Sequence, residues 1–334
     1  MNVLVTGGAG YIGSHAVKRL LADGHAVTVV DNLDRGHRAA ALAAGAAEPD
    51  TLPIDLRDTD RLTAELRSRG VEAVVHFAAL AYVGESVTDP LTYYDNNTAG
   101  SLSLLHAMHA AGVKRLVFSS TCATYGEPDR MPITEDMPQH PINPYGASKL
   151  FVERILKDYA AANPDFAFAA LRYFNVCGSD PNAAIGEDHD PETHLIPVLL
   201  NVALGKKDKL TIFGDDFNTP DGTCVRDYIH VEDLVDAHVV VMHALQPGDQ
   251  RFYNLGTGEG KTVKQVLDAA RRVTGHAIPA EVGPRRPGDP PELYANADKI
   301  HQELGWHARH TDLDQTIAHA WRWFQAHPAG YGDI

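Results

Sequence analysis

The chain has 334 residues, and its 44 acidic side chains outnumber its 29 basic ones, which gives a net charge of −15. This length leaves room for about two domains, with a core that needs no disulfide or metal support. The acidic balance argues against a general nucleic-acid binder, and no apolar run reaches the roughly 18 residues of a membrane span. The widely spaced Cys122, Cys177 and Cys224, and the lack of a basic, apolar leader after Met1, predict a cytoplasmic protein.

Short apolar strands alternate with helices over the first half of the chain. In chain order, we expect strands at 3–5, 26–30, 73–77, 115–119 and 166–171, and helices at 11–22, 58–69, 98–111 and 145–162. Buried strands that alternate with helices pair in parallel and are covered on both faces. The pattern therefore predicts an α/β fold with a Rossmann-type, doubly wound parallel sheet.

The pattern changes after residue 175. Residues 176–222 are rich in Gly, Pro, Asp and Asn, clear helices are expected at 231–244, 262–274 and 313–326, and the proline-rich stretch 279–291 is interpreted as an ordered surface or ligand loop. We predict a nucleotide-binding Rossmann domain over 1–175 and a smaller α/β substrate domain over 176–334, some segments of which pack back onto the first domain.

A glycine-rich loop lies between the first strand and the first helix. Gly8, Gly10 and Gly13 are spaced as in dinucleotide-binding turns, and Gly7 offers a second frame with the same two partners. Glycines without Cβ let backbone N–H groups approach a pyrophosphate at the helix N-terminus. Asp31 follows the second strand, where an acid binds the adenosine ribose and repels a 2′-phosphate. The sequence thus predicts NAD rather than NADP; a plain turn with a solvated aspartate is the alternative.

Tyr145 and Lys149 lie one helical turn apart, on one face. A phenol is a poor base at neutral pH, but a neighbouring ammonium and a cationic nicotinamide ring would stabilise its phenolate. Thr121 follows a strand, at the sheet edge where such folds bind ligands, and its hydroxyl can relay a proton. We predict that these three side chains remove a proton from a sugar hydroxyl during hydride transfer; a surface Tyr-Lys pair is the alternative.

Longer motifs carry a resemblance over nearly the whole chain. They are residues 5–15, 83–87, 93–97, 171–175, 221–231 and 253–258. Together with the glycine loop and the Tyr-Lys pair, they resemble the extended short-chain dehydrogenase/reductases and, within them, the UDP-glucose 4-epimerase family. The resemblance implies interconversion of UDP-galactose and UDP-glucose by transient oxidation at C4 with bound NAD.

The resemblance also implies site residues. For the cofactor, the matching positions are Gly7, Gly10, Tyr11, Ile12, Asp31, Asn32, Asp55, Leu56, Phe77, Asn96, Lys149 and Tyr173. For the UDP-sugar, they are Thr121, Tyr145, Asn175, His194, Leu195, Phe213, Arg226, Arg286, Asp289 and Leu293. A planar guanidinium suits a diphosphate, although Arg226 could instead pair with a nearby aspartate and Arg286 could be a solvated loop charge.

Four positions depart from the pattern that the resemblance implies. Thr121 stands where serine is usual, and Ala81 stands where some members have lysine, so one cofactor contact is missing. His194 replaces an asparagine of some relatives. Leu293 is intermediate between the tyrosine of members restricted to glucose and galactose and the small residue of members that also accept N-acetylated sugars. We therefore expect a preference for UDP-glucose and UDP-galactose, with weak activity on UDP-GlcNAc and UDP-GalNAc.

The family often dimerises through the helices near 98–112 and 145–162, so the resemblance implies a homodimer. No metal site is predicted, and residues 187–190 are interpreted as a solvated loop.

A 4-epimerase of another UDP-sugar, such as a UDP-pentose or UDP-glucuronate, stays open because the same catalytic trio would serve. A 4,6-dehydratase is disfavoured, because it would need carboxylates after Thr121, where Cys122 and Ala123 stand. An NAD-sensing regulator is also disfavoured, because such proteins usually lose the tyrosine or the lysine, and this chain keeps both.

Overall fold

The computed structural model describes residues 1–286 and 290–332. A seven-stranded sheet dominates it, with every neighbouring pair parallel, in the order β10-β6-β5-β4-β1-β2-β3. The strands are β1 (Asn2–Thr6), β2 (Ala26–Asp31), β3 (Thr51–Pro53), β4 (Ala73–His76), β5 (Arg115–Ser119), β6 (Ala167–Tyr173) and β10 (Gln250–Leu255). The strand order reverses between β1 and β4, as in doubly wound folds. The predicted Rossmann-type sheet is confirmed.

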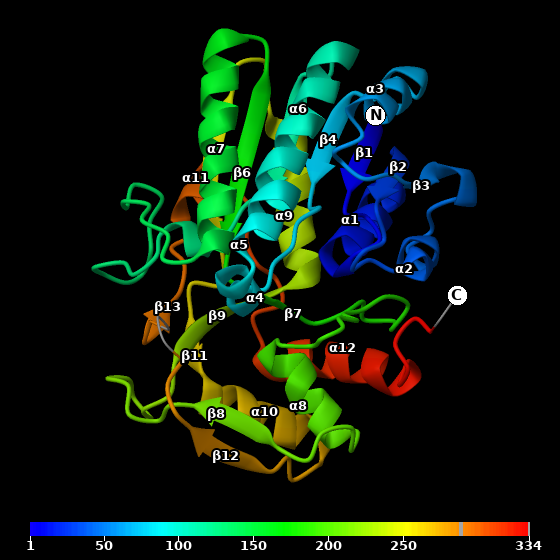
Figure 1. Ribbon diagram of the computed structural model, residues 1–334. Helices are drawn as coiled ribbons and strands as arrows, with labels where there is room; N and C mark the ends of the chain where they lie inside the picture. Colours follow the sequence, from blue (N-terminus) through cyan, green and yellow to red (C-terminus); the bar gives the residue numbers. More distant parts are fainter. Residues whose placement is uncertain (287–289, 333–334) are drawn as a thin grey trace.

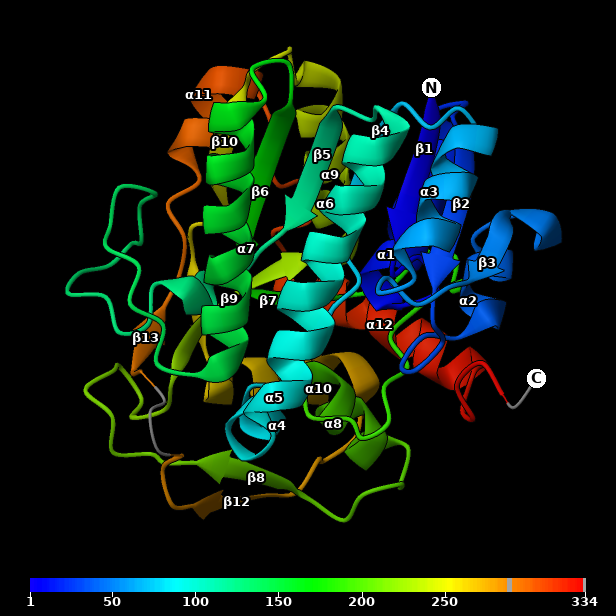
Figure 2. The same ribbon diagram turned by 45° about the horizontal axis from the view of Figure 1, so that its top comes forward.

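Helices cover both faces of this sheet (Figures 1 and 2). One face carries α1 (Tyr11–Ala22), α9 (Val231–Ala244) and α11 (Asp298–Leu304), with α2 (Arg38–Ala43) at its edge, and the other carries α3 (Thr59–Ser68), α6 (Gly100–Ala111) and α7 (Pro144–Ala162). The predicted helices at 11–22 and 145–162 are confirmed, and the one at 58–69 differs only at its ends, where Asp58 accepts a hydrogen bond from the backbone N–H of Arg61 and caps α3.

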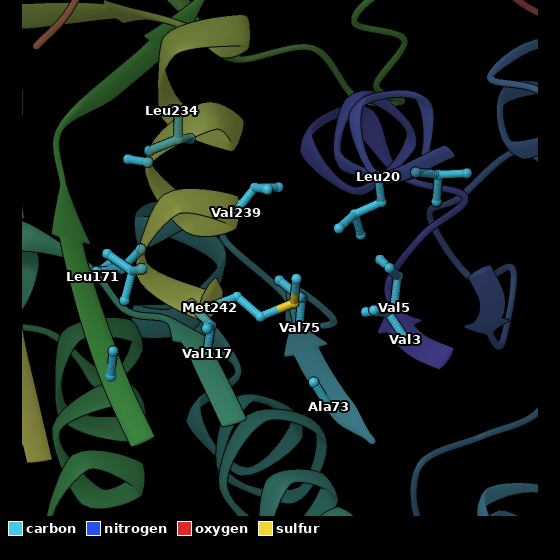
Figure 3. Close-up of a cluster of buried hydrophobic side chains, with 14 of the residues drawn as sticks. Val3, Val5, Leu20, Ala73, Val75, Val117, Leu171, Leu234, Val239 and Met242 are labelled. Carbon is cyan, nitrogen blue, oxygen red and sulfur yellow. The ribbon is translucent and has the colours of Figure 1, made fainter. Parts of the chain in front are cut away.

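Alternate side chains of each strand enter the two layers of core. On β1, Val3 and Val5 face α1 and α9, whereas Leu4 faces α3 and α6. Figure 3 shows the first of these layers, in which Met242 of α9 reaches toward the strands beside Val75. Each fully buried aliphatic side chain of this kind stabilises the fold by roughly 1.5–3 kcal/mol. Both faces are therefore apolar, and only the ends of the strands are left for polar chemistry.

A smaller α/β part lies beyond the carboxyl ends of the large sheet (Figure 1). Its elements are β7 (Asn175–Cys177), α8 (Leu195–Ala203), β8 (Leu210–Phe213), β9 (Val225–His230), β11 (Gly260–Thr262), α10 (Val263–Thr274), β12 (Ala280–Gly283), β13 (Glu292–Leu293) and α12 (Leu313–Ala326). Helices α8, α10 and α12 share one core, which is closed by β8. Between 176 and 222, where no element was expected, the structure has α8 and β8, since their apolar side chains are buried only by segments distant in sequence.

The chain crosses between the two parts more than once. Strand β10 pairs in parallel with β6, and α9 packs on α1, although both elements follow β7 and α8 in sequence. Within the described residues, no helix combines the length and the apolar character needed to cross a lipid bilayer.

The segment before α6 is less regular than the sequence suggested. Helices α4 (Val83–Thr88) and α5 (Pro90–Tyr93) lead into a π-helical stretch, Tyr94–Ala99, and α6 follows without a cap. The wider π turn directs Asn97 inward, where its side-chain oxygen accepts a hydrogen bond from the backbone N–H of Leu80 and its amide donates to Ser148. The π turn therefore ties this segment to α7.

Candidate active site

One cavity of about 1350 Å³ lies where the large sheet meets the smaller part. It is lined by every predicted site residue that the structure describes, from both sequence halves: Gly7, Gly10, Tyr11, Ile12, Gly13, Asp31, Asn32, Asp55, Leu56, Phe77, Asn96, Thr121, Tyr145, Lys149, Tyr173, Asn175, His194, Leu195, Phe213, Arg226, Arg286 and Leu293. The remaining predicted residue, Asp289, lies outside the described residues. The cavity opens at the carboxyl ends of the strands, where doubly wound sheets bind ligands.

The glycine loop is shaped by close backbone contacts. Gly7 has a φ of +69°, and a Cβ at this position would lie 2.6 Å from the backbone nitrogen of Ala78. A Cβ on Gly13 would collide with the carbonyl oxygen of Gly7. Without these side chains, α1 begins directly against β1, with Gly10 at its N-cap. The N-terminal N–H groups of α1 therefore face the cavity, an arrangement that suits a pyrophosphate.

Asp31 ends β2 and is held in place by backbone donors. Its carboxylate accepts hydrogen bonds from the N–H of Ala9 at 3.0 Å and of Leu33 at 2.9 Å. Burial raises its pKa, and these donors partly oppose the shift. A Cβ on Gly36 would lie 2.9 Å from either carboxylate oxygen. The glycine leaves room beside the carboxylate for a sugar diol.

Tyr145 and Lys149 begin α7, which starts at Pro144 and is capped by Asn143, whose side chain accepts a hydrogen bond from the N–H of Gly146. Burial raises the pKa of Tyr145, and a hydrogen bond with the Thr121 side chain acts in the opposite direction. The Lys149 ammonium donates to the carbonyl oxygen of Ser119 at 2.9 Å. Three groups predicted from two separate motifs thus meet at the end of β5.

The amine of Lys149 is buried and forms no ion pair with a carboxylate of the described residues, and burial lowers its pKa from 10.5 to about 7. Below about pH 7 the amine is charged in both the folded and the unfolded chain, so folding bears the full cost of desolvating the ammonium. Above about pH 10.5 it is neutral in both states, and this cost disappears. Lys149→Met is therefore expected to stabilise the cofactor-free protein by about 2 kcal/mol at pH 6, after loss of the hydrogen bond to Ser119, and to destabilise it at pH 10, where little more than that loss remains. Urea unfolding of the two proteins at both pH values measures this.

The matched control for this prediction is Lys157→Met, because Lys157 is exposed on the same helix. That variant is expected to show nearly the same change at both pH values. A stability change for Lys149→Met that does not depend on pH would contradict the argument.

The other end of the cavity is lined by the smaller part. Strand β13 pairs with β9 so that Leu293 lies opposite Arg226, and both line the cavity. Leu293 packs on the apolar cluster around Ile133 and Phe174, and so does Cys122, the residue after Thr121. The guanidinium of Arg286 stacks on the ring of Phe213 at 3.9 Å. This end thus offers two cations and an aromatic face, a combination that suits a nucleoside diphosphate.

A family model for the NAD dependent epimerase/dehydratase family matches residues 3–256. The chain belongs to this family. Relatives include a UDP-glucose 4-epimerase from Corynebacterium glutamicum, which is 52% identical over 328 residues and covers 98% of this chain and 96% of that protein. UDP-arabinose 4-epimerase 1 from Arabidopsis thaliana is 49% identical over 340 residues, and the match covers 99% of this chain and 81% of that protein.

Solved structures agree with this assignment. A UDP-glucose 4-epimerase from Bifidobacterium longum in complex with NAD+ and UDP has a TM-score of 0.94 and 40% identity, covering 99% of this chain and 100% of that one. The resemblance inferred from the sequence motifs is thus confirmed for family, fold and cofactor.

Some residues that form or support the cavity of this epimerase/dehydratase family member were not anticipated. Asn97, which holds the cavity residue Leu80, follows Asn96 within the 93–97 motif, so its positioning role could have been suspected from that motif. Glu187, His189 and Glu192 also line the cavity. The interpretation of residues 187–190 as a solvated loop is wrong for Glu187, whose side chain is 4% exposed. The alternation of Glu and His up to His194 was the available signal.

Proposed function

We propose that the protein interconverts UDP-galactose and UDP-glucose by inverting the sugar at C4. The observation that carries the proposal is the meeting of Tyr145, Lys149 and Thr121 in a cavity bounded by a dinucleotide loop and, at its other end, by Arg226 and Arg286. The UDP-glucose 4-epimerases that are about half identical to this chain, over nearly their full length, support the same substrate.

The residues present fit NAD. The backbone cradle at Gly7 and Gly13 would be filled by any Cβ, and the carboxylate of Asp31 lies at the end of β2 with space beside it. NAD held by these residues would supply the acceptor, and later the donor, of the hydride at sugar C4. The absence of a cationic side chain at Ala81, which is exposed at the cavity wall, supports a cofactor held less firmly.

Tyr145 is the proposed base: its phenolic oxygen removes the proton of the sugar 4-hydroxyl and later returns it to O4. Because burial raises its pKa in the cofactor-free cavity, the phenolate needs additional positive charge nearby. Lys149, one turn along α7, and an oxidised nicotinamide ring both provide such charge. Thr121 orients the hydroxyl of Tyr145 and relays the proton. Proton removal is therefore coupled to the presence of the oxidised cofactor.

Arg226 and Arg286 are proposed to bind the diphosphate, and Phe213, Leu195 and Asn175 to line the nucleotide and sugar. Support comes from their shared position on the cavity wall. Both guanidinium groups can grip phosphate oxygens bidentately.

We also propose that the chain divides into two domains near residue 175 and that the protein works in the reducing cytoplasm. The second of these proposals is supported by Cys122, Cys177 and Cys224, which form no disulfide.

Purified protein mixed with UDP-galactose, without added NAD, tests the function when the anomeric signals are followed by proton NMR. Appearance of UDP-glucose would establish 4-epimerisation and show that the cofactor co-purifies. If conversion appears only after NAD is added, the function holds and the cofactor is lost on purification. No conversion with NAD present would refute UDP-galactose as the substrate.

A second candidate is a 4-epimerase of a UDP-pentose, which is favoured by the 49% identity to UDP-arabinose 4-epimerase 1. The same NMR experiment with UDP-arabinose distinguishes the two by the ratio of kcat/KM values.

Leu293 is proposed to limit the space beside the sugar 2-substituent. We expect the protein to prefer UDP-galactose to UDP-GalNAc, and Leu293→Ala to raise kcat/KM for UDP-GalNAc relative to UDP-galactose about tenfold, because a few methylene volumes change such ratios by roughly 1–3 kcal/mol. Leu293→Tyr, the opposite change, is expected to lower the ratio. Equal kcat/KM for both sugars in the unmodified protein would contradict this preference.

A homodimer is proposed through α4–α7. Large apolar side chains are exposed over these helices, with Val87 61%, Leu91 78% and Phe151 42% exposed. Such a cluster is unusual on a monomer surface. Light scattering is expected to give the mass of two chains, and Leu91→Asp combined with Phe151→Asp the mass of one. A one-chain mass for the unmodified protein would refute the dimer.

A further inference from the structure

Two glutamates and two histidines converge in the segment that leads into α8. Glu187, His189, Glu192 and His194 come from eight consecutive residues, and one ligand atom of each lies within 4.8 Å of all the others. The Nδ1 atom of His194 is 2.9 Å from Glu187 Oε1 and 3.2 Å from Glu192 Oε1. The Nδ1 atom of His189 is 3.1 Å from Glu187 Oε1 and 3.6 Å from Glu192 Oε2.

The imidazole-to-carboxylate spacings resemble four of the six edges of a tetrahedral metal site, with Glu192 facing each imidazole through a different oxygen. Zinc binds histidine nitrogen and carboxylate oxygen at about 2.0–2.1 Å, so two ligands of one tetrahedron lie about 3.3 Å apart. The four distances, from 2.9 to 3.6 Å, bracket that value. Imidazole together with carboxylate suits zinc better than magnesium or calcium, which prefer oxygen ligands alone.

The two imidazole nitrogens also lack another partner. Nδ1 of His189 and Nδ1 of His194 are buried, and neither makes a hydrogen bond, although Glu187 Oε1 is close to both. The ring nitrogens thus point away from the line to that oxygen. Leaving a buried polar atom without a partner costs roughly 1–3 kcal/mol, so two such atoms side by side call for an explanation.

A metal-free cluster of two ion pairs is the competing explanation. Burial alone would lower the pKa of both imidazoles, but Glu187 and Glu192 outweigh it and raise the pKa of His189 to about 9 and of His194 to about 10. Each imidazolium would then direct its N–H at a carboxylate oxygen. The observed ring orientations do not provide that alignment at Nδ1.

We propose that Glu187, His189, Glu192 and His194 form a site for one divalent transition-metal ion of the zinc type. The four ligands and the ion together carry no net charge when the imidazoles are neutral. His194 is the N-cap of α8 and Leu195 its first residue, so the ion would staple the loop that leads into this wall of the cavity. The ligands line the cavity, which gives the ion a path from solvent.

Two other groups with ligand-type side chains do not share these features. In the group of His230, Glu232 and His310, Nδ1 of His230 accepts a hydrogen bond from the N–H of Glu232, and its Nε2 pairs with His319. The group of Asp23, His25 and His243 is largely exposed. Among the described residues, the segment 187–194 is therefore the site to test.

Metal content decides the proposal without any activity assay. Full-length protein without an affinity tag, produced with added Zn²⁺ and dialysed, is expected to contain about one zinc per chain by mass spectrometry of the metal. Co²⁺ added to the metal-stripped protein is expected to give the visible absorption of a tetrahedral complex. No zinc above about a tenth per chain and no such absorption would overturn the proposal.

Variants locate the ion. His189→Ala and Glu192→Gln are each expected to lower the zinc content at least about tenfold, and Glu192→Gln keeps the side-chain shape should the alanine variant fail to fold. His243→Ala is the control, because it removes a ligand-type histidine from the exposed group. Zinc retained in both cluster variants, or lost in His243→Ala, would place the ion elsewhere and refute the site.

Discussion

Tyr145→Phe is expected to lower kcat for conversion of UDP-galactose about 10³-fold while leaving the affinity for NAD nearly unchanged. Removal of the phenolic oxygen deletes the proposed base, and a positioned base typically contributes 10²–10⁴ in rate. The ring itself stays, so its edge-on contact with the ring of Tyr93, at 6.5 Å between centroids, is preserved. Proton NMR gives the rate, and titration with NAD gives the affinity.

Tyr159→Phe is the matched control for this result. Tyr159 lies on the same helix, and its hydroxyl makes an exposed hydrogen bond with His109. The same loss of one oxygen there is expected to leave turnover within about twofold of the original rate. If Tyr145→Phe also stayed within that range, Tyr145 would not be the base, and the assignment of the catalytic group would fail.

Glu153→Ala is expected to destabilise the protein by about 3–5 kcal/mol. Glu153 and Arg172 form an ion pair at 2.6 Å in which the side chains are 0% and 3% exposed. Removal of the carboxylate leaves a buried guanidinium without its counter-charge. Urea unfolding measures the loss as a lower midpoint.

The same glutamate also supports the active site. It accepts a hydrogen bond from Ser120 at 2.6 Å, next to Thr121, and Arg172 precedes Tyr173, another cavity residue. Arg172 in turn donates to the hydroxyl of Tyr125. The variant is therefore expected to lose activity together with stability, because the ends of β5 and β6 are positioned by one charge network.

Two comparisons make the stability prediction specific. The double variant Glu153→Leu with Arg172→Met is expected to lose less stability than Glu153→Ala, because no unpaired charge is left buried. Asp165→Ala removes one partner of the exposed ion pair between Lys114 and Asp165 and is expected to cost under about 1 kcal/mol. A loss for Glu153→Ala as small as that of Asp165→Ala would show that burial does not determine the effect.

Several features could be predicted from the sequence because the signal is local. The spacing of Gly10 and Gly13 after a short apolar strand specifies a strand, a tight turn and a helix, and the structure has all three. Tyr145 and Lys149 share a helix face by their four-residue separation alone. Parallel strands bring their carboxyl ends to one edge, so residues at strand ends, such as Asp31 and Thr121, could be assigned to one cavity.

Other features were decided only by the tertiary structure. The return of β10 to the large sheet, the register that sets Leu293 opposite Arg226, and the burial of Glu153 against Arg172 all join segments distant in sequence. Such pairings depend on the path of loops and on which apolar faces remain uncovered, and a local pattern encodes neither.

The cluster from Glu187 to His194 shows the same division within a single loop. Its residue types and spacing are visible in the sequence, and so is its place before an apolar helix. Alternating glutamate and histidine is equally compatible with a solvated loop, which is how the sequence alone was interpreted. Only the folded chain buries Glu187 and brings two imidazole nitrogens close to it, because the start of α1, the segment around Tyr82 and the start of α8 close around that stretch. Local chemistry thus determined what could bind, and packing between distant segments decided where the ligands meet.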